Sequence, residues 1–338
     1  MYRIFRPFLF KLDPEVSHVL TLSALRTAGA LPPVLQMLKW MYATPSKPVQ
    51  AFGLTFKNPV GLAAGYDKDG VAIRGLSALG LSHVEIGTVT PRPQPGNPKP
   101  RVFRLVEDQA VINRMGFPGK GMEFVAQKLS RFARSDVILG INLGKNKDTP
   151  LEKAASDYIE LIRRFMASAD YLTINISSPN TVGLRRLQGR EMLEGLLNEI
   201  KKEREMISLG RGGCAPILVK IAPDMNDDEL EDAVDAILNA GMDGIIATNT
   251  TLAREGLRSR HRGESGGLSG SPLTGKSEAV LGQVVKLVNG KVPIVSVGGI
   301  MNSDNAKKRL ALGASLVQVY TGLVYCGPKL VQEIVRSL

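Results

Sequence analysis

The chain has 338 residues, 43% hydrophobic and 22% charged, which excludes extensive disorder and fits about two domains, or one α/β barrel of about 250 residues with an extension. Its two cysteines and three histidines are too few and too scattered for a zinc site, an iron–sulfur site or a disulfide framework, so we expect no metal, and redox chemistry would require an organic cofactor. The net charge of +11 favours anionic partners, but no long Lys/Arg block predicts a nucleic-acid-binding arm.

Residues 1–47 differ from the rest of the chain. They hold six of the 18 aromatic residues, and six basic side chains against two acidic ones. An N-cap, a first-turn proline and a first-turn acid at Asp13-Pro14-Glu15 predict a helix that ends at Gly29, and Pro32-Pro33 predicts the start of a second helix. Two short amphipathic helices with basic flanks suit a membrane surface, whereas a helical hairpin packed on its own domain explains the pattern equally well.

The start of the chain carries no signal for export or for a membrane span. No uncharged apolar run reaches the ~18 residues that cross a bilayer. Pro7, Lys11 and Asp13 interrupt the first residues, and no small-residue cleavage site follows them. We therefore expect a protein that is neither secreted nor membrane-spanning.

From about residue 50, short apolar runs alternate with longer helix-like segments. Many of these runs are β-branched and almost continuously apolar, as expected for parallel strands that are buried on both faces. Eight β–α units over residues 48–338 predict a (β/α)8 TIM barrel of the α/β class rather than an open doubly wound sheet. The predicted strands are Val60–Ala64, His83–Gly87, Val137–Leu143, Tyr171–Ile176, Ile217–Ile221, Gly244–Thr248, Pro293–Val297 and Leu316–Tyr320.

The segments between these strands are of two kinds. Residues 91–117, with alternating apolar residues over Arg101–Val106, predict an inserted hairpin. Residues 251–275, rich in glycine and serine, predict a mobile loop. The clearest predicted helices are Glu152–Ala167, Glu191–Ile207, Asp227–Asn239 and Lys276–Asn289.

Each predicted strand ends in polar or small residues, among them Asn142, Asn175, Lys220 and Asn249. Because the carboxyl ends of the strands meet at one rim of such a barrel, these residues predict a polar ligand over the barrel mouth. Asparagine offers a donor and an acceptor on one planar group, which matches the edge of a flavin or pyrimidine ring. The amine of Lys220 meets an anion or acts as a Schiff-base nucleophile, with a solvated surface lysine as the alternative.

Glycines follow the last two predicted strands, in Gly298-Gly299 and Tyr320-Thr321-Gly322. Barrels of this kind bind phosphate at these positions through backbone N–H groups, and a side chain would hold the phosphate away from the backbone. The pattern predicts a phosphate site, with ordinary turn glycines as the alternative.

Six motifs, in order along the chain, resemble those of the dihydroorotate dehydrogenase family. They are residues 61–69 (GLAAGYDKD), 85–97 (EIGTVTPRPQPGN), 113–117 (NRMGF), 175–181 (NISSPNT), 247–251 (ATNTT) and 266–270 (GGLSG). The resemblance implies an FMN-containing barrel that oxidises dihydroorotate to orotate in pyrimidine biosynthesis. The N-terminal extension, together with Ser178 where the soluble class 1 enzymes carry a cysteine, implies the membrane-associated class 2, which uses a quinone as electron acceptor.

The resemblance also implies which residues form the site. Ser178 would accept the substrate proton, with Thr181 and a water near Phe117 as a relay. The residues expected around FMN are Ala64, Gly65, Tyr66, Asp67, Lys68, Thr88, Asn142, Asn175, Lys220, Thr248, Gly270, Gly299, Tyr320 and Thr321. Those expected around the substrate are Lys68, Asn113, Arg114, Met115, Gly116, Phe117, Asn175, Asn180, Asn249 and Thr250.

The same resemblance divides the chain into two functional parts. Residues 1–47 would associate with the cytoplasmic face of the inner cell membrane as a peripheral anchor and give the quinone access, and residues 48–338 would form the catalytic domain. No nucleic-acid partner is implied.

Three other interpretations of the sequence stay open. A barrel aldolase would use Lys220 as a Schiff-base nucleophile. A flavin barrel acting on tRNA uridine would suit the charge of +11, but it would not explain the aromatic extension, and its RNA binding would depend strongly on salt. A non-catalytic binding protein would leave the lysine and serine at the strand ends without a function.

Overall fold

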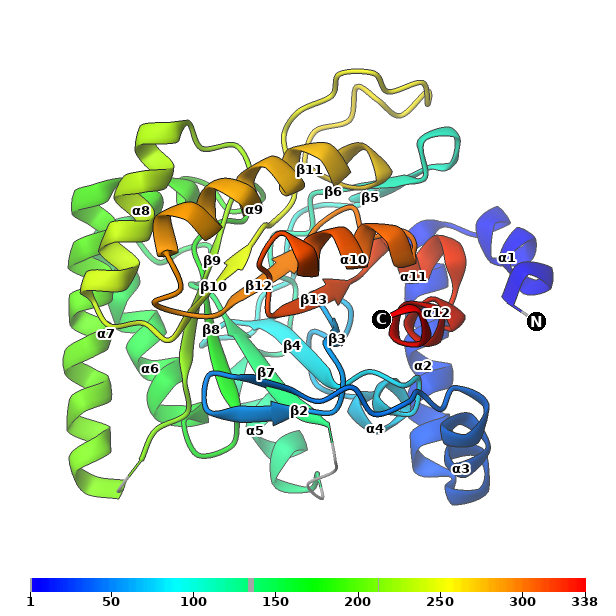
Figure 1. Cartoon of the computed structure of the whole chain (residues 1–338), viewed down its shortest axis with the longest axis horizontal. Helices are drawn as coiled ribbons and strands as arrows, with labels where there is room; N and C mark the ends of the chain where they lie inside the picture. Colours follow the sequence, from blue (N-terminus) through cyan, green and yellow to red (C-terminus); the bar gives the residue numbers. More distant parts are fainter. Residues whose placement is uncertain (1, 133–136, 212) are drawn as a thin grey trace.

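The computed structural model describes residues 2–132, 137–211 and 213–338. Eight parallel strands close into a barrel with helices around it (Figure 1), so the predicted (β/α)8 fold is confirmed. Around the barrel the strands follow the order β10, β12, β13, β3, β4, β7, β8, β9. Their bounds are β3 Val60–Leu62, β4 His83–Val89, β7 Ile138–Leu143, β8 Tyr171–Asn175, β9 Ile217–Ile221, β10 Gly244–Ala247, β12 Ile294–Val297 and β13 Leu316–Val319.

The apolar runs form strands because both of their faces are covered. Every residue of β4, β8 and β9 is buried, between the barrel interior on one side and the surrounding helices on the other. All eight predicted strands are present, and each end lies within two residues of its predicted position. The largest differences, of two residues, lie at β3, which ends at Leu62 before the predicted Ala64, and at β4, which continues to Val89 beyond the predicted Gly87.

The helices around the barrel bury an apolar face against the strands. In α8 the apolar face contains Leu230, Val234 and Ile237, and a capping box between Asn226 and Glu229 starts the helix. The helices after the extension are α4 Ile73–Ser77, α5 Gly121–Ser130, α6 Ala154–Phe165, α7 Arg190–Arg211, α8 Asp227–Asn239, α9 Thr274–Val288, α10 Ser303–Ala311, α11 Thr321–Cys326 and α12 Lys329–Ser337.

The amino-terminal end of the barrel is closed by a small hairpin, β1 Val49–Ala51 and β2 Leu54–Phe56. The Phe52 ring lies so close to Gly244, at the start of β10, that a Cβ on this glycine would be 2.4 Å from the ring. Phe56 is fully buried and contacts the His83 ring edge to face. This end of the barrel is therefore filled by side chains, and the cavity described below lies at the opposite end, where the strands finish.

A three-stranded antiparallel sheet stands over that open end, at the top of Figure 1. The predicted inserted hairpin is confirmed as β5 Val102–Leu105 and β6 Ala110–Asn113. The prediction of one mobile loop over residues 251–275 is wrong in part, because β11 Gly267–Gly270 pairs with β6. Its glycine-rich sequence has little strand propensity of its own, and its partner lies about 150 residues away along the chain, so the pairing is a tertiary effect.

The N-terminal extension contains three helices: α1 Tyr2–Lys11, α2 Pro14–Ala30 and α3 Pro32–Met41. The two predicted helices are confirmed, with Asp13 accepting hydrogen bonds from the N–H groups of Glu15 and Val16 as the N-cap of α2. We did not predict α1, because Pro7 lies inside it and proline usually ends a helix. Among the described residues, no helix is both long enough and apolar enough to cross a bilayer.

One face of the extension packs tightly on the barrel. Helix α2 crosses α4 where Gly29 faces Gly75; a Cβ on Gly75 would be 2.1 Å from the Leu25 carbonyl oxygen. Two arginines of the inserted hairpin hold the turn between α1 and α2. Arg101 forms an ion pair with Glu15 at 2.8 Å, and Arg104 donates to the carbonyls of Phe10 and Leu12, both at 2.9 Å.

Another part of the extension surface is apolar and exposed. Phe5, Phe8 and Trp40 are 60%, 66% and 78% exposed, far more than aromatic side chains usually are in a folded domain. Further exposed apolar side chains of the extension are Ile4, Leu12, Val16, Val19, Leu20, Leu31 and Met37. The extension thus packs on the barrel and still presents a broad apolar surface to its surroundings.

Candidate functional site

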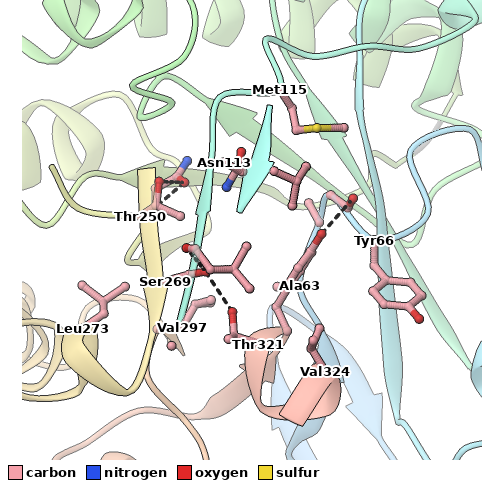
Figure 2. Close-up of a pocket in the computed structure, with 18 of the residues that line it drawn as sticks. Ala63, Tyr66, Asn113, Met115, Thr250, Ser269, Leu273, Val297, Thr321 and Val324 are labelled. Atoms are coloured by element: carbon pink, nitrogen blue, oxygen red, sulfur yellow. Dashed lines mark hydrogen bonds between the residues drawn. The ribbon is translucent and has the colours of Figure 1, made fainter. Parts of the chain in front are cut away.

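A cavity opens at the carboxyl ends of the barrel strands, between the barrel mouth, the three-stranded sheet and α2. Figure 2 labels some of the side chains around it, including Asn113 and Met115 from the sheet side and Thr321 and Val324 from α11. Of the residues predicted as the base, around FMN and around the substrate, all but three line this cavity. They are Ala64, Gly65, Tyr66, Lys68, Thr88, Asn113, Met115, Gly116, Phe117, Asn175, Ser178, Asn180, Lys220, Thr248, Asn249, Thr250, Gly270, Gly299, Tyr320 and Thr321.

The three remaining predicted residues, Asp67, Asn142 and Arg114, do not line the cavity. Asp67 is buried and accepts hydrogen bonds from the N–H groups of Val71 and Ala72, so it holds the turn before α4. Asn142 does not reach the cavity itself, but it accepts hydrogen bonds from Thr88 and Asn175, which do. Arg114 points outward, where it pairs with Glu264 at 2.7 Å and lies over the Phe103 ring.

The floor of the cavity is a network of buried amides and hydroxyls. The Asn142 Oδ1 accepts from Thr88 Oγ1 at 2.6 Å and from Asn175 Nδ2 at 2.9 Å. The Asn142 Nδ2 in turn donates to Glu85 Oε1 at 2.8 Å. Since each partner fixes the orientation of the next, these groups present a defined pattern of donors and acceptors to a planar ligand.

Glu85 is a fully buried carboxylate inside the barrel that we did not predict as part of the site. Besides Asn142, its oxygens accept from the Tyr171 hydroxyl at 3.1 Å and from Gln318 Nε2 at 2.9 Å. The signal was present in the sequence, because a glutamate between Val84 and Ile86 interrupts an otherwise apolar strand.

Lys220 extends from β9 into the cavity beside Asn175, its register partner on β8. Burial lowers the pKa of Lys220, and the Glu85 carboxylate opposes this shift. Among the described residues, the Lys220 ammonium has no hydrogen-bond partner, so it is free to contact a ligand that carries or gains negative charge.

A second part of the cavity is suited to an anion. Gly299, Ile300, Thr321 and Gly322 line it, and their backbone N–H groups donate to no acceptor within the described part of the chain. Gly299 has φ +70°, and a Cβ there would lie 2.4 Å from Thr274 Cα, so only glycine fits. Unpaired N–H groups at glycine-rich turns are typical of phosphate sites.

On the other side of the cavity lie the residues predicted for substrate and base. Ser178 is buried, and its Oγ accepts from the Asn180 N–H at 3.3 Å. Thr181, predicted as part of the relay, does not line the cavity, and its Oγ1 is buried without a hydrogen-bond partner in the described residues. Lys68 donates to the Gly65 carbonyl at 2.7 Å, and burial lowers its pKa to about 8.

Helix α2 of the extension completes the cavity wall with Pro14, Glu15 and His18. Burial and the charge of Lys68 lower the pKa of His18 to about 3, so this imidazole is neutral at physiological pH. Its ring contacts Tyr66 edge to face, with centroids 5.0 Å apart. We did not predict these residues, because nothing in the local sequence indicates that the extension folds back onto the barrel mouth.

The model of the dihydroorotate dehydrogenase family matches residues 47–338, which is most of the chain. The chain belongs to the dihydroorotate dehydrogenase family. The family resemblance carried by the six motifs is therefore confirmed, and the aldolase and binding-protein interpretations of the barrel are excluded.

Relatives in this family match the whole chain, including the extension. A dihydroorotate dehydrogenase (quinone) from Pseudomonas putida is 48% identical over 100% of this chain and 98% of its own length. One of the same name from Roseiflexus sp. is 47% identical over 100% of this chain and 93% of its own. Among solved structures, DHODH from Eimeria tenella in complex with ferulenol has a TM-score of 0.87 at 40% identity, covering 96% of this chain and 90% of that chain.

Proposed function

We propose that this member of the family is a flavin-dependent oxidoreductase that converts dihydroorotate to orotate and passes the electrons to a quinone, a step of pyrimidine biosynthesis. The relatives that match its whole length carry this activity in their names. The observation that best supports it is the composition of the cavity, where an amide floor with Lys220, an anion site and a buried Ser178 lie together.

We assign the flavin as FMN, because the cavity has one anion site and a separate site for a planar ring. The unpaired N–H groups of Gly299 and Thr321 would hold a single phosphate, and Thr88, Asn175 and Lys220 would surround the ring. When bound, FMN accepts a hydride from the substrate and delivers electrons to the quinone. The ammonium of Lys220 would stabilise the negative charge that the ring gains in this reaction.

The chain's own residues then supply the remaining chemistry. Oxidation of dihydroorotate removes a proton from C5 and a hydride from C6. Ser178 Oγ would take the proton, and the unpartnered hydroxyl of Thr181 is a candidate for passing it on. The amides of Asn113, Asn180 and Asn249 would hold the substrate ring, and Lys68 its carboxylate.

The purified protein is expected to be yellow and to release FMN on denaturation. When dihydroorotate is added without oxygen, the flavin absorbance at about 450 nm should be lost. A short-chain quinone should then restore the colour. A preparation that binds no flavin after reconstitution, or a bound flavin that dihydroorotate leaves oxidised, would contradict the proposal.

Lys68 gives the reaction a defined pH dependence. The pKa of Lys68 is lowered to about 8, so in the free enzyme its positive charge is present below that pH and is lost as the pH rises through it. If Lys68 binds the substrate carboxylate, kcat/KM for dihydroorotate should fall about tenfold per pH unit above about pH 8. In Lys68→Met, kcat/KM should be low at all pH values and should not fall further above about pH 8. Lys202→Met, at an exposed lysine of α7, should show the same pH dependence as the wild type.

We further propose that residues 1–47 attach the enzyme to the cytoplasmic face of the inner cell membrane as a peripheral anchor, and that residues 48–338 are the catalytic domain. The exposed side chains of Phe5, Phe8 and Trp40 support this, because apolar and aromatic groups favour the bilayer interface. Because α2 also lines the cavity, a quinone arriving from the bilayer would meet the flavin from the side of the extension.

A further inference from the structure

A half-buried ion pair, Arg185 with Asp224, lies at the rim of the barrel beside the substrate side of the cavity. The two side chains are 20% and 18% exposed, and Arg185 Nη1 is 2.8 Å from Asp224 Oδ2. Arg185 belongs to the short 3-10 helix η3, Leu184–Gln188, and Asp224 lies in the loop after β9. Neither residue lines the cavity, and the mechanism above uses neither.

Arg185 ties together two loops that carry site residues. Its Nε donates to the Ser177 carbonyl at 3.0 Å, next to Ser178. Its Nη2 donates to the Thr250 carbonyl at 2.7 Å, next to Asn249. The three nitrogens of one planar guanidinium therefore contact the loop after β8, the loop after β9 and the loop after β10 at the same time.

Asp224 fixes the far side of the same junction. Its Oδ1 accepts from Thr251 Oγ1 at 2.5 Å and from Lys276 Nζ at 2.6 Å. Its Oδ2 accepts from the Leu252 N–H at 2.9 Å, where residues 252–265 leave the barrel. Burial alone would raise the pKa of Asp224, but the hydrogen bonds from Lys276, Thr251 and Arg185 outweigh it and lower the pKa to about 2. The carboxylate is therefore ionised at every pH at which the enzyme would work.

We propose that the Arg185–Asp224 pair is a positioning pair for dihydroorotate oxidation, which holds the loop of Ser178 and the loop of Asn249 and Thr250 in register with each other. This inference rests on the proposed function. A base and the groups that orient its substrate lie on separate loops here, and a displacement of about 1 Å between them costs about a hundredfold in rate. Loops with few such contacts are the more mobile parts of a fold.

Asp224→Asn is the sharpest test, because it keeps the shape of the side chain. All four partners of Asp224 are donors, so the amide NH2 of asparagine would face a donor on either side. We expect flavin reduction by dihydroorotate to slow at least about tenfold, with reoxidation by a quinone unchanged. Stopped-flow absorbance measures the two half-reactions separately. Arg185→Lys should not rescue the rate, since one ammonium cannot reach the Ser177 carbonyl, Asp224 and the Thr250 carbonyl together.

The matched control is Arg190→Met, which breaks the exposed ion pair between Arg190 and Asp232 at 2.7 Å, on helices of the same side of the barrel. It should change neither half-reaction. If Asp224→Asn fails to fold, Lys276→Met removes only the more exposed cation, and a loss of about threefold, confined to flavin reduction, is expected. Equal slowing of both half-reactions, or no slowing, would overturn the positioning role, whereas a wild-type flavin that dihydroorotate does not reduce would refute the proposed function itself.

Discussion

Replacing Ser178 by alanine is expected to slow flavin reduction by dihydroorotate about 100-fold or more, with the flavin still bound. The hydroxyl is the proposed acceptor of the C5 proton, and alanine removes it while leaving the backbone in place. Ser178 is 6% exposed, and the loss of one oxygen opens little space. Rapid mixing with dihydroorotate in the absence of oxygen, followed at the flavin absorbance, measures this step alone.

The hydroxyl of Thr181 allows the relay to be tested separately. Free serine has a pKa far above 7, so it is a weak base unless the proton can move on. Thr181→Val removes a buried hydroxyl that has no partner among the described residues, so its structural cost should be small. We expect an intermediate slowing of flavin reduction in this variant. Reoxidation of the flavin by a quinone should stay unchanged in both variants. If dihydroorotate bleached the flavin of Ser178→Ala at the wild-type rate, the assignment of Ser178 as the base would be refuted.

Deleting residues 2–47 is expected to abolish turnover with a quinone embedded in lipid vesicles and to spare flavin reduction by dihydroorotate. The physical reason is that the extension carries the exposed apolar surface and one wall of the cavity, whereas Ser178, Lys220 and Gly299 all belong to the barrel. Measuring the two half-reactions separately on the truncated protein tests this. Equal loss of both would indicate that the extension acts only in folding.

Because the deletion also removes the partners of Arg101 and Arg104, a milder variant is needed. Replacing Phe5, Phe8 and Trp40 by serine in the full chain should reduce sedimentation with vesicles and turnover with embedded quinone. Reoxidation by a soluble short-chain quinone should remain normal. The control is Leu209→Ser, at a residue 90% exposed on α7, across the barrel from the extension in Figure 1. Vesicle binding that survives the triple substitution would contradict the proposed anchor.

The barrel was predictable because its signals are local. Strand β9 has the predicted bounds, since Ile-Leu-Val-Lys-Ile between a proline and a turn has few other ways to bury its side chains. The same holds for α8, whose capping residue Asn226 and apolar spacing lie within one stretch of chain. Asn142, Asn175, Lys220 and Asn249 were found because each lies at the end of such a strand. The other site residues, such as Asn113 and Gly270, were implied by the family motifs.

Contacts between distant segments were not predictable. The pairing of β11 with β6 depends on residues about 150 positions apart and not on strand propensity. In the sequence, Glu15 and His18 look like ordinary helix residues. They form part of the cavity wall because Arg101 and Arg104 hold the extension against the inserted hairpin. Arg114 shows the converse, because a residue inside a recognisable motif points away from the cavity.

The order of the elements, the type of barrel and the residues at each strand end follow from hydrophobic periodicity and turn chemistry, which act over a few residues and are written directly in the sequence. The closure of the cavity by α2, the buried partners of Glu85 and the tie between Arg185 and Asp224 were decided only by the tertiary structure. The reason is that burial and hydrogen bonding between distant segments depend on how whole elements pack, and no local pattern specifies that packing.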